Sequence, residues 1–209
     1  MKKIANIAVD IETLSKRSTA AIIGIAAMPF SLGYDQVANE GAYFHMAIDA
    51  TSCAMHGLHF DQSTVEWWSK QPEDAKRQFD YTHDIVHALE ALAFYIRETK
   101  KDNGADVVRI WCQGTDFDIS ILRNVFALVF NDPKEEKLPW NYYDVRDSRT
   151  FINEGLRLLY PSDDNPIDRV PKAEGLRKHD VVSDCKWLIH NVKWVNDELS
   201  RTMHNHEEV

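Results

Sequence analysis

Alternating apolar and polar positions, together with runs of β-branched residues, predict strands mainly in the first part of the chain. We expect strands at residues 4–11, 20–29 and 41–48, because these segments are rich in residues that fit a pleated sheet. Their order and short connections suit an antiparallel meander. A β-branched run over residues 107–112 predicts a further strand, and a short one is expected near residues 140–145.

Apolar residues repeat every three or four positions in other segments, and this spacing predicts helices. The expected helices cover residues 64–69, 85–100, a stretch after 116, 148–159 and 181–201. Strands followed by alternating helix and strand fit an α/β sheet with helices on its faces. Residues 160–178, rich in Pro and Asp, are predicted to form a loop that could close over a substrate.

Composition narrows the class of protein. The chain has 209 residues without repeats or low-complexity linkers, so one domain over residues 1–209 is the simplest division. A formal net charge of −9 argues against broad binding of long duplexes, which rests on lysine and arginine side chains that neutralise phosphates. No segment fits a signal peptide or a membrane span, so we expect a cytoplasmic protein with no membrane partner.

Three cysteines, Cys53, Cys112 and Cys185, are too few for a disulfide framework. Cys112 and Cys185 fall on apolar elements, so we expect reduced thiols in the core. The spacing C-x-x-H-x-x-H, with Cys53, His56 and His59, would offer three zinc ligands. A structural zinc site normally takes four protein ligands and no fourth is close in sequence, so we do not expect one here.

Two acidic residues interrupt the first apolar run, IANIAVDIET. Asp10 and Glu12 are two positions apart, so on a strand both carboxylates leave the same face of the sheet. Like charges on a buried strand repel each other unless a divalent cation, which prefers hard oxygen ligands, neutralises them. The pair would equally fit two solvated acids at a strand end, so a metal site depends on partners elsewhere in the chain.

Two later segments offer such partners. In WCQGTDFDISIL, Asp116 and Asp118 lie between a strand and a helix, where sites gather in open α/β sheets. We expect Asp116 to cap the helix and Asp118 to be the better metal ligand. In KHDVVSDCKWLIHNV, Asp180 is placed to cap a helix, with His179 just before it and Asp184 one turn inside.

Together these positions form the pattern D-x-E, then D, then H-x-x-x-x-D, carried by Asp10, Glu12, Asp118, His179 and Asp184. The pattern resembles the DEDDh branch of the 3′-to-5′ exonucleases. Three longer stretches resemble a phage and bacterial subfamily of these enzymes: DQSTVEWWSKQPEDAKRQF, WCQGTDFDISIL and YYDVRDSRTF. That subfamily includes the mycobacterial-type 3′-to-5′ exoribonuclease domain and is similar to exonuclease A of T-even phages. The resemblance covers nearly the whole chain.

The resemblance implies a fold and a reaction. The fold would be α/β and RNase H-like, with a single mixed five-stranded sheet flanked by helices. The enzyme would remove 5′-mononucleotides from the 3′ ends of single-stranded DNA or RNA, or from 3′ overhangs. Two Mg²⁺ or Mn²⁺ ions about 4 Å apart would stabilise both the attacking and the leaving oxygen. The choice between DNA and RNA stays open, and a homodimer is implied by the resemblance alone.

The resemblance also assigns roles to the motif residues. Asp10 would bridge both metal ions, and Glu12 and Asp184 would complete the site nearest the attacking water. Asp118 would serve the metal at the leaving group, directly or through water. His179 would be the general base, which suits an imidazole because its ordinary pKa is about 6.5.

Substrate contacts are predicted around these motifs. Thr13 and Leu14, directly after the first motif, are expected to contact the substrate. Among the nearby cations, Arg149 and Lys178 are the preferred candidates for binding phosphate, although an ordinary surface role would explain each of them.

Aromatic residues near the motifs have two possible roles. Trp67 and Trp68 point about 100° apart on a helix, so at most one can lie fully in the core while the other edges a cleft. For Trp68 and Phe117, core packing is the expected role. Phe117, next to Asp118, is the better candidate for stacking on a base.

Two other function classes fit part of the pattern. A catalytically silent nucleic-acid-binding or scaffolding relative would normally have lost a ligand, and this chain has kept all of them. An RNase H-like endonuclease or transposase also uses clustered acids. Against this second class, the D-x-E pair within the first strand and the spacing from His179 to Asp184 match exonuclease motifs.

Overall fold

A mixed sheet runs through the centre of the protein. The computed structural model describes residues 2–33 and 40–207, and within them six strands pair in the order β4-β3-β2-β1-β5-β6. The strands are β1 (Ile4–Thr13), β2 (Ile22–Phe30), β3 (Phe44–Ile48), β4 (Thr82–His83), β5 (Val107–Cys112) and β6 (Val145–Asp147). The first three form the predicted antiparallel meander. Parallel pairing joins β4 to β3, β5 to β1 and β6 to β5.

The prediction of five strands was one short. The sixth strand, β4, has only two residues, both exposed, so no apolar alternation marks it in the sequence. The short strand expected at residues 140–145 was placed too early. Residues Tyr142–Asp144 form a 3₁₀ turn, η2, and β6 begins at Val145. Tyr142 and Tyr143 have high strand propensity, but both are exposed, and propensity without burial does not make a strand.

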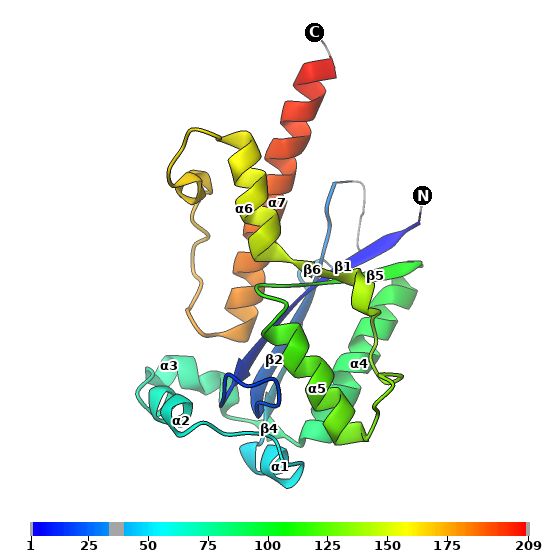
Figure 1. The fold of residues 1–209 in the computed structure, drawn as a ribbon, viewed down its shortest axis with the longest axis vertical. Helices are drawn as coiled ribbons and strands as arrows, with labels where there is room; N and C mark the ends of the chain where they lie inside the picture. The colour runs from blue at the N-terminus through cyan, green and yellow to red at the C-terminus, as the bar shows by residue number, and fades with distance from the viewer. Residues whose placement is uncertain (1, 34–39, 208–209) are drawn as a thin grey trace.

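Helices cover both faces of the sheet (Figure 1). They are α1 (Ala50–Met55), α2 (Gln62–Ser69), α3 (Glu73–Lys76), α4 (Ile85–Asp102), α5 (Asp118–Phe130), α6 (Ser148–Leu159) and α7 (Val181–Glu207), with the 3₁₀ turns η1 (Arg77–Phe79) and η3 (Pro166–Arg169). The pair α4 and α5 covers one face, and α6 and α7 cover the other. The predicted helices are confirmed, several of them longer than expected. The predicted loop over residues 160–178 contains η3. None of the described helices could cross a membrane.

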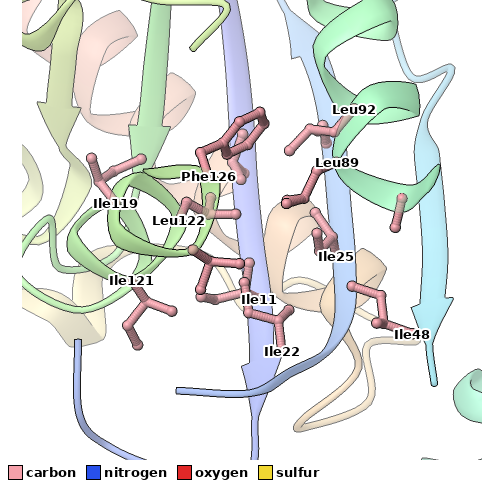
Figure 2. Close-up of a cluster of buried hydrophobic side chains, with 14 of the residues drawn as sticks. Ile11, Ile22, Ile25, Ile48, Leu89, Leu92, Ile119, Ile121, Leu122 and Phe126 are labelled. Carbon is pink, nitrogen blue, oxygen red and sulfur yellow. The ribbon is translucent and has the colours of Figure 1, made fainter. Parts of the chain in front are cut away.

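The larger core lies between the sheet and the pair α4 and α5. Ile7, Val9 and Ile11 of β1 all point to this side, as expected of alternate strand positions. Figure 2 shows part of this cluster, in which isoleucines of β1, β2 and β3 meet side chains of α4 and α5. Its labelled residues are Ile11, Ile22, Ile25, Ile48, Leu89, Leu92, Ile119, Ile121, Leu122 and Phe126.

The opposite face carries a smaller core beneath α6 and α7. Ala8 of β1 belongs to it and packs with Val181, Cys185 and Leu188 of α7. Because strand side chains alternate, Asp10 and Glu12 share this face with Ala8. The strand therefore turns its apolar residues toward α4 and α5 and its two acids toward the start of α7.

Local signals explain where several of the helices begin. The carboxylate of Asp180 accepts the backbone N–H of Ser183 at 2.8 Å, which confirms the predicted cap of α7. Asp84 and Asp147 cap α4 and α6 in the same way. The three cysteines are free and buried, as expected for reduced core thiols.

Candidate active site

Three carboxylates from distant parts of the chain meet at the end of β1. Asp10 and Glu12 come from the strand, and Asp184 comes from the first turn of α7. Each offers one oxygen, and these oxygens all lie within 4.8 Å of one another. Within residues 2–33 and 40–207, no other set of three or more potential metal ligands is this close. The arrangement therefore concentrates hard oxygen ligands in one place.

Strand register leaves this end of β1 unpaired on the side of β5, while β2 pairs with it on the other side. The pairing of β1 with β5 ends at Ala8↔Trp111, so Asp10 and the residues after it extend past β5. Asp118, at the start of α5, occupies the space beyond the end of β5. Its side chain is buried and accepts a hydrogen bond from the backbone of Ile11. A fourth carboxylate thus reaches β1 from the helix on the opposite face.

Burial raises the pKa of all four acids, and the charges of neighbouring carboxylates add to the effect. Burial is the main cause for Asp10, whose pKa lies well above its ordinary value, and the charges of Asp118, Glu12 and Asp184 add to the effect. Burial, followed by the charges of Asp184 and Asp118, raises the pKa of Glu12 to about 8. The pKa of Asp118 rises to about 7 and that of Asp184 to about 6, again mainly through burial. Such a site favours protons or cations over free carboxylates.

His179 lies in the loop directly before α7 and is exposed to solvent. Its backbone has φ of 58°, a left-handed conformation that residues other than glycine rarely adopt. The carboxylate of Asp184 accepts a hydrogen bond from the backbone of His179, so this residue lies directly beside the acids. The ring stands edge-to-face with Trp67, with ring centroids 4.8 Å apart and an interplanar angle of 86°.

Comparisons with known proteins establish the family of this chain. The profile of the 3′-5′ exoribonuclease Rv2179c-like domain matches residues 5–205. The chain belongs to this family. It is therefore a 3′-to-5′ exonuclease, a phosphodiester hydrolase. An exodeoxyribonuclease of Enterobacteria phage T4 is 28% identical over 196 residues, which cover 85% of this chain and 82% of the phage protein.

Solved structures of exonuclease I have a similar fold. The zinc-bound complex of the Escherichia coli enzyme with single-stranded DNA is 16% identical, with a TM-score of 0.59, and covers 98% of this chain. A product-bound exonuclease I structure is 18% identical, with a TM-score of 0.55, and covers 96% of this chain. The chain spans less than half of those proteins, 43% and 45% of their lengths. The likeness is one of fold, and the fold of this exonuclease is RNase H-like.

The two adjacent tryptophans of this exonuclease divide their roles as predicted. Trp68 is buried, and its indole Nε1 donates to the carbonyl oxygen of Thr13 at 3.0 Å. Trp67 is 40% exposed and contacts the ring of His179. The segment TVEWW therefore links the end of β1 to the loop that carries His179. The sequence indicated only that one of the two tryptophans could edge a cleft, and it gave no partner for Trp67.

Two predictions near α5 were wrong. The first residue of α5 is Asp118, and its N-cap position is occupied by Phe117 without a side-chain hydrogen bond. Asp116 is exposed in the preceding turn and does not cap the helix. Phe117 is 37% exposed, so core packing is not its role. The turn is held by Asp147, whose carboxylate accepts the backbone N–H of Thr115, a contact invisible in the sequence.

The predicted substrate residues lie around the acids of this exonuclease in different environments. Thr13 and Leu14 are buried, and the Thr13 hydroxyl donates to the carbonyl of Ser15. Arg149 donates to the carbonyl of Gln113, and its charge lowers the pKa of Asp118, so the guanidinium lies on the side of the acids. Phe117 and Lys178 are exposed. Contact of any of these side chains with substrate stays a prediction.

The spacing of Cys53, His56 and His59 serves the fold around α1. The Cys53 thiol is buried and donates to the carbonyl of Ile22 at 3.3 Å. A ring nitrogen of His59 pairs with the hydroxyl of Ser15 at 2.8 Å. These contacts fasten α1 and the segment after it to β2 and to the end of β1.

Proposed function

We propose that this exonuclease releases 5′-mononucleotides from the 3′ end of single-stranded nucleic acid, using two divalent metal ions and a histidine general base. The observation that carries the proposal is the meeting of Asp10, Glu12 and Asp184, whose carboxylate oxygens lie within 4.8 Å of one another. Asp118 reaches the same strand from the opposite helix layer. Family membership gives the class of reaction, and these acids provide the ligands for the proposed metal ions.

The donor set suits Mg²⁺ or Mn²⁺. All four candidate ligands are carboxylates, which these cations prefer, and neither thiol nor imidazole is among them. The raised pKa of Glu12 and of Asp118 is a cost of placing like charges together in a buried site. Divalent cations held by Asp10, Glu12, Asp118 and Asp184 would remove that cost. When bound, two such ions would polarise the scissile phosphate and make a water molecule a stronger nucleophile.

His179 is proposed to take the proton of the attacking water. The residue is exposed, which allows a water and a phosphate to reach it, while its backbone is tied to Asp184. As the water oxygen bonds to phosphorus, the proton would pass to His179 and the bond from phosphorus to the 3′ oxygen would break, with the leaving 3′ oxygen taking a proton from solvent. The products are a 5′-mononucleotide and a strand shortened by one residue with a new 3′ hydroxyl.

Single strands are the proposed substrates, and the proposal includes both DNA and RNA. The net charge of −9 supplies no broad cationic surface for a long duplex, so binding must rest on local cations such as Arg149. The matched family is described as an exoribonuclease and the phage relative as an exodeoxyribonuclease. These two names support activity on RNA and on DNA respectively.

Digestion of matched single strands tests the proposal. Single-stranded DNA and RNA of the same sequence, each labelled at the 5′ end, are incubated with Mg²⁺, Mn²⁺ or EDTA. We expect a ladder that shortens from the 3′ end with either metal, none in EDTA, and none with Asp10→Ala. Asp116→Ala, which removes an exposed acid close to the site, is the matched control and should cleave normally. Binding without cleavage in all conditions would favour a silent nucleic-acid-binding relative.

A further inference from the structure

One side chain, Gln78 in η1, holds the backbone of the loop that carries His179. Its Nε2 donates to the carbonyl oxygen of His179 at 2.5 Å and to that of Ala75 at 2.8 Å. Its Oε1 accepts the backbone N–H of Val181 at 3.1 Å. A single amide therefore fixes the peptide groups on both sides of Asp180, across about 100 residues of sequence.

The conformation of His179 needs such support. With φ of 58°, its backbone lies in the left-handed region, where a side chain crowds the following carbonyl. Residues other than glycine stay there only when their surroundings hold them. The hydrogen bond from Gln78 fixes the carbonyl of this residue, and the orientation of that peptide determines where the imidazole points.

The segment that carries Gln78 has a rigid base. Phe79, the next residue, stands edge-to-face with Trp68, with ring centroids 5.1 Å apart. The same ring lies against β2, because a Cβ placed on Gly24 would be 3.0 Å from it. Glycine at position 24 thus permits η1 to sit directly on the sheet.

A second tether joins the same two segments. The guanidinium of Arg177 donates to the carbonyl of Asp74, near the start of α3, at 3.4 Å. It also pairs with the carboxylate of Asp180 at 3.4 Å. The loop before α7 is therefore fastened to α3 and η1 through Arg177 and through Gln78, and of these two side chains Gln78 is the one that bonds to His179 itself.

From these contacts we infer that Gln78 is a positioning residue of the reaction, which holds His179 in the orientation needed for proton transfer. The inference rests on the proposed role of His179 as general base. The three hydrogen bonds of Gln78 described above all go to backbone groups and none to the acids. Its effect on the rate would pass through His179 alone, and this separates it from a residue that only stabilises the fold.

Replacement of Gln78 by methionine tests the inference. Gln78→Met keeps the length of the side chain and removes all three hydrogen bonds. The matched control is Gln62→Met on α2, which removes a hydrogen bond from Gln62 to the exposed Glu66. We expect kcat to fall by roughly 10- to 100-fold in Gln78→Met, because a displacement of about 1 Å can cost a factor of about 100. In Gln78→Met, KM and the affinity for Mn²⁺ in the absence of substrate should stay within about twofold of the values for the unaltered protein. In Gln62→Met, these two quantities should also stay within about twofold.

A double variant separates positioning from general stability. If Gln78 acts through His179, Gln78→Met should cause no further loss of rate in a His179→Ala background. An equal loss in both backgrounds, a parallel loss of Mn²⁺ affinity, or an unchanged kcat in Gln78→Met would overturn the inference. A normal rate for His179→Ala would instead overturn the proposed general base, whatever Gln78→Met does.

A measurement that does not depend on catalysis distinguishes a failure of the inference about Gln78 from a failure of the proposed function. The His179 ring packs against Trp67, so the ring current of Trp67 should displace the proton resonances of His179, which can be assigned by their loss in His179→Ala. In Gln78→Met these resonances should move toward the values of an unstructured histidine, and in Gln62→Met they should not move. Unchanged His179 resonances in Gln78→Met would contradict the inference, and this result does not depend on whether the protein cleaves any substrate.

Discussion

At the scale of single residues, the site consists of acids in a place where their charge is costly. Asp10 is surrounded by Asp118, Glu12 and Asp184, and each of these raises its pKa further than burial alone. Natural proteins keep such an arrangement when it serves a purpose, and strongly raised carboxyl pKa values in one cluster mark a functional site.

Removing one of these charges should separate function from stability. We predict that Asp10→Asn lowers the cleavage rate by at least about 10³-fold, because it removes a ligand that the two proposed metal ions share. The same variant should be at least as stable as the unaltered protein in EDTA, because it also removes a repelling charge. Cleavage assays with Mg²⁺ and thermal unfolding in EDTA check the two parts. A variant that is inactive because it is unfolded in EDTA would contradict the prediction.

The histidine should show a different pattern from the acids. We predict that His179→Ala lowers the cleavage rate by roughly 10² to 10⁴, the usual contribution of a positioned general base. The affinity of this variant for Mn²⁺, measured by calorimetry, should change little, because the proposed metal ligands are carboxylates and His179 is not one of them. A loss confined to metal affinity would make His179 a ligand.

At the scale of elements, the relative placement of β1, β5 and α7 builds the site. β1 runs past the end of its pairing with β5, and α7 begins over the same end of β1. The position of α7 depends in turn on α6, which lies along it (Figure 1). Their close approach requires Gly155, because a Cβ there would lie 2.4 Å from Cγ1 of Val195.

This contact yields a stability prediction. We expect Gly155→Ala to lower the free energy of unfolding by about 1 to 2 kcal/mol, because overpacking outweighs the higher helix propensity of alanine. Val195→Ala should make room for the added methyl group, so the double variant should lose less stability than the sum of the single losses. Urea unfolding of the four proteins measures this coupling. Strict additivity would mean that α6 and α7 separate without strain.

At the scale of the whole molecule, the buried acids couple folding to pH. The folded pKa values of Glu12, Asp118 and Asp184, about 8, 7 and 6, all exceed those of the unfolded chain. Between about pH 4 and pH 8 the folded protein therefore binds more protons than the unfolded one, and its stability falls as the pH rises.

We predict that the free energy of unfolding in EDTA is lower at pH 8 than at pH 5 by roughly 3 kcal/mol. The individual shifts would give more at about 1.4 kcal/mol per unit, but solvent and local rearrangement screen part of the repulsion. Urea unfolding at the two pH values measures the difference, and Glu12→Gln should make it smaller. Saturating Mg²⁺ should reverse much of the loss at pH 8. Equal stability of metal-free protein at both pH values would contradict the prediction.

The limits of prediction can be traced to particular residues. Alternation in β1 was enough to predict that Asp10 and Glu12 share a face, and the capping pattern before α7 was enough for Asp180. The wrong role for Asp116 and for Phe117 arose because Asp147, about 30 residues later, holds the turn before α5. Strand β4 escaped notice because its two residues pair through backbone alone and bury no side chain.

Local patterns in the sequence were enough to predict most of the elements and the motif residues, because periodicity and spacing lie within one segment of the chain. Folding of distant segments onto one another set which groups meet. It brought Asp184 within reach of Asp10, placed the edge of Trp67 against the imidazole of His179, and gave Gln78 its partners about 100 residues away. Such contacts depend on packing between distant segments, which leaves no periodic trace in a single sequence. For the same reason the raised pKa values of the acids, which come from burial and from charges brought in by folding, belong to the fold and not to the motif.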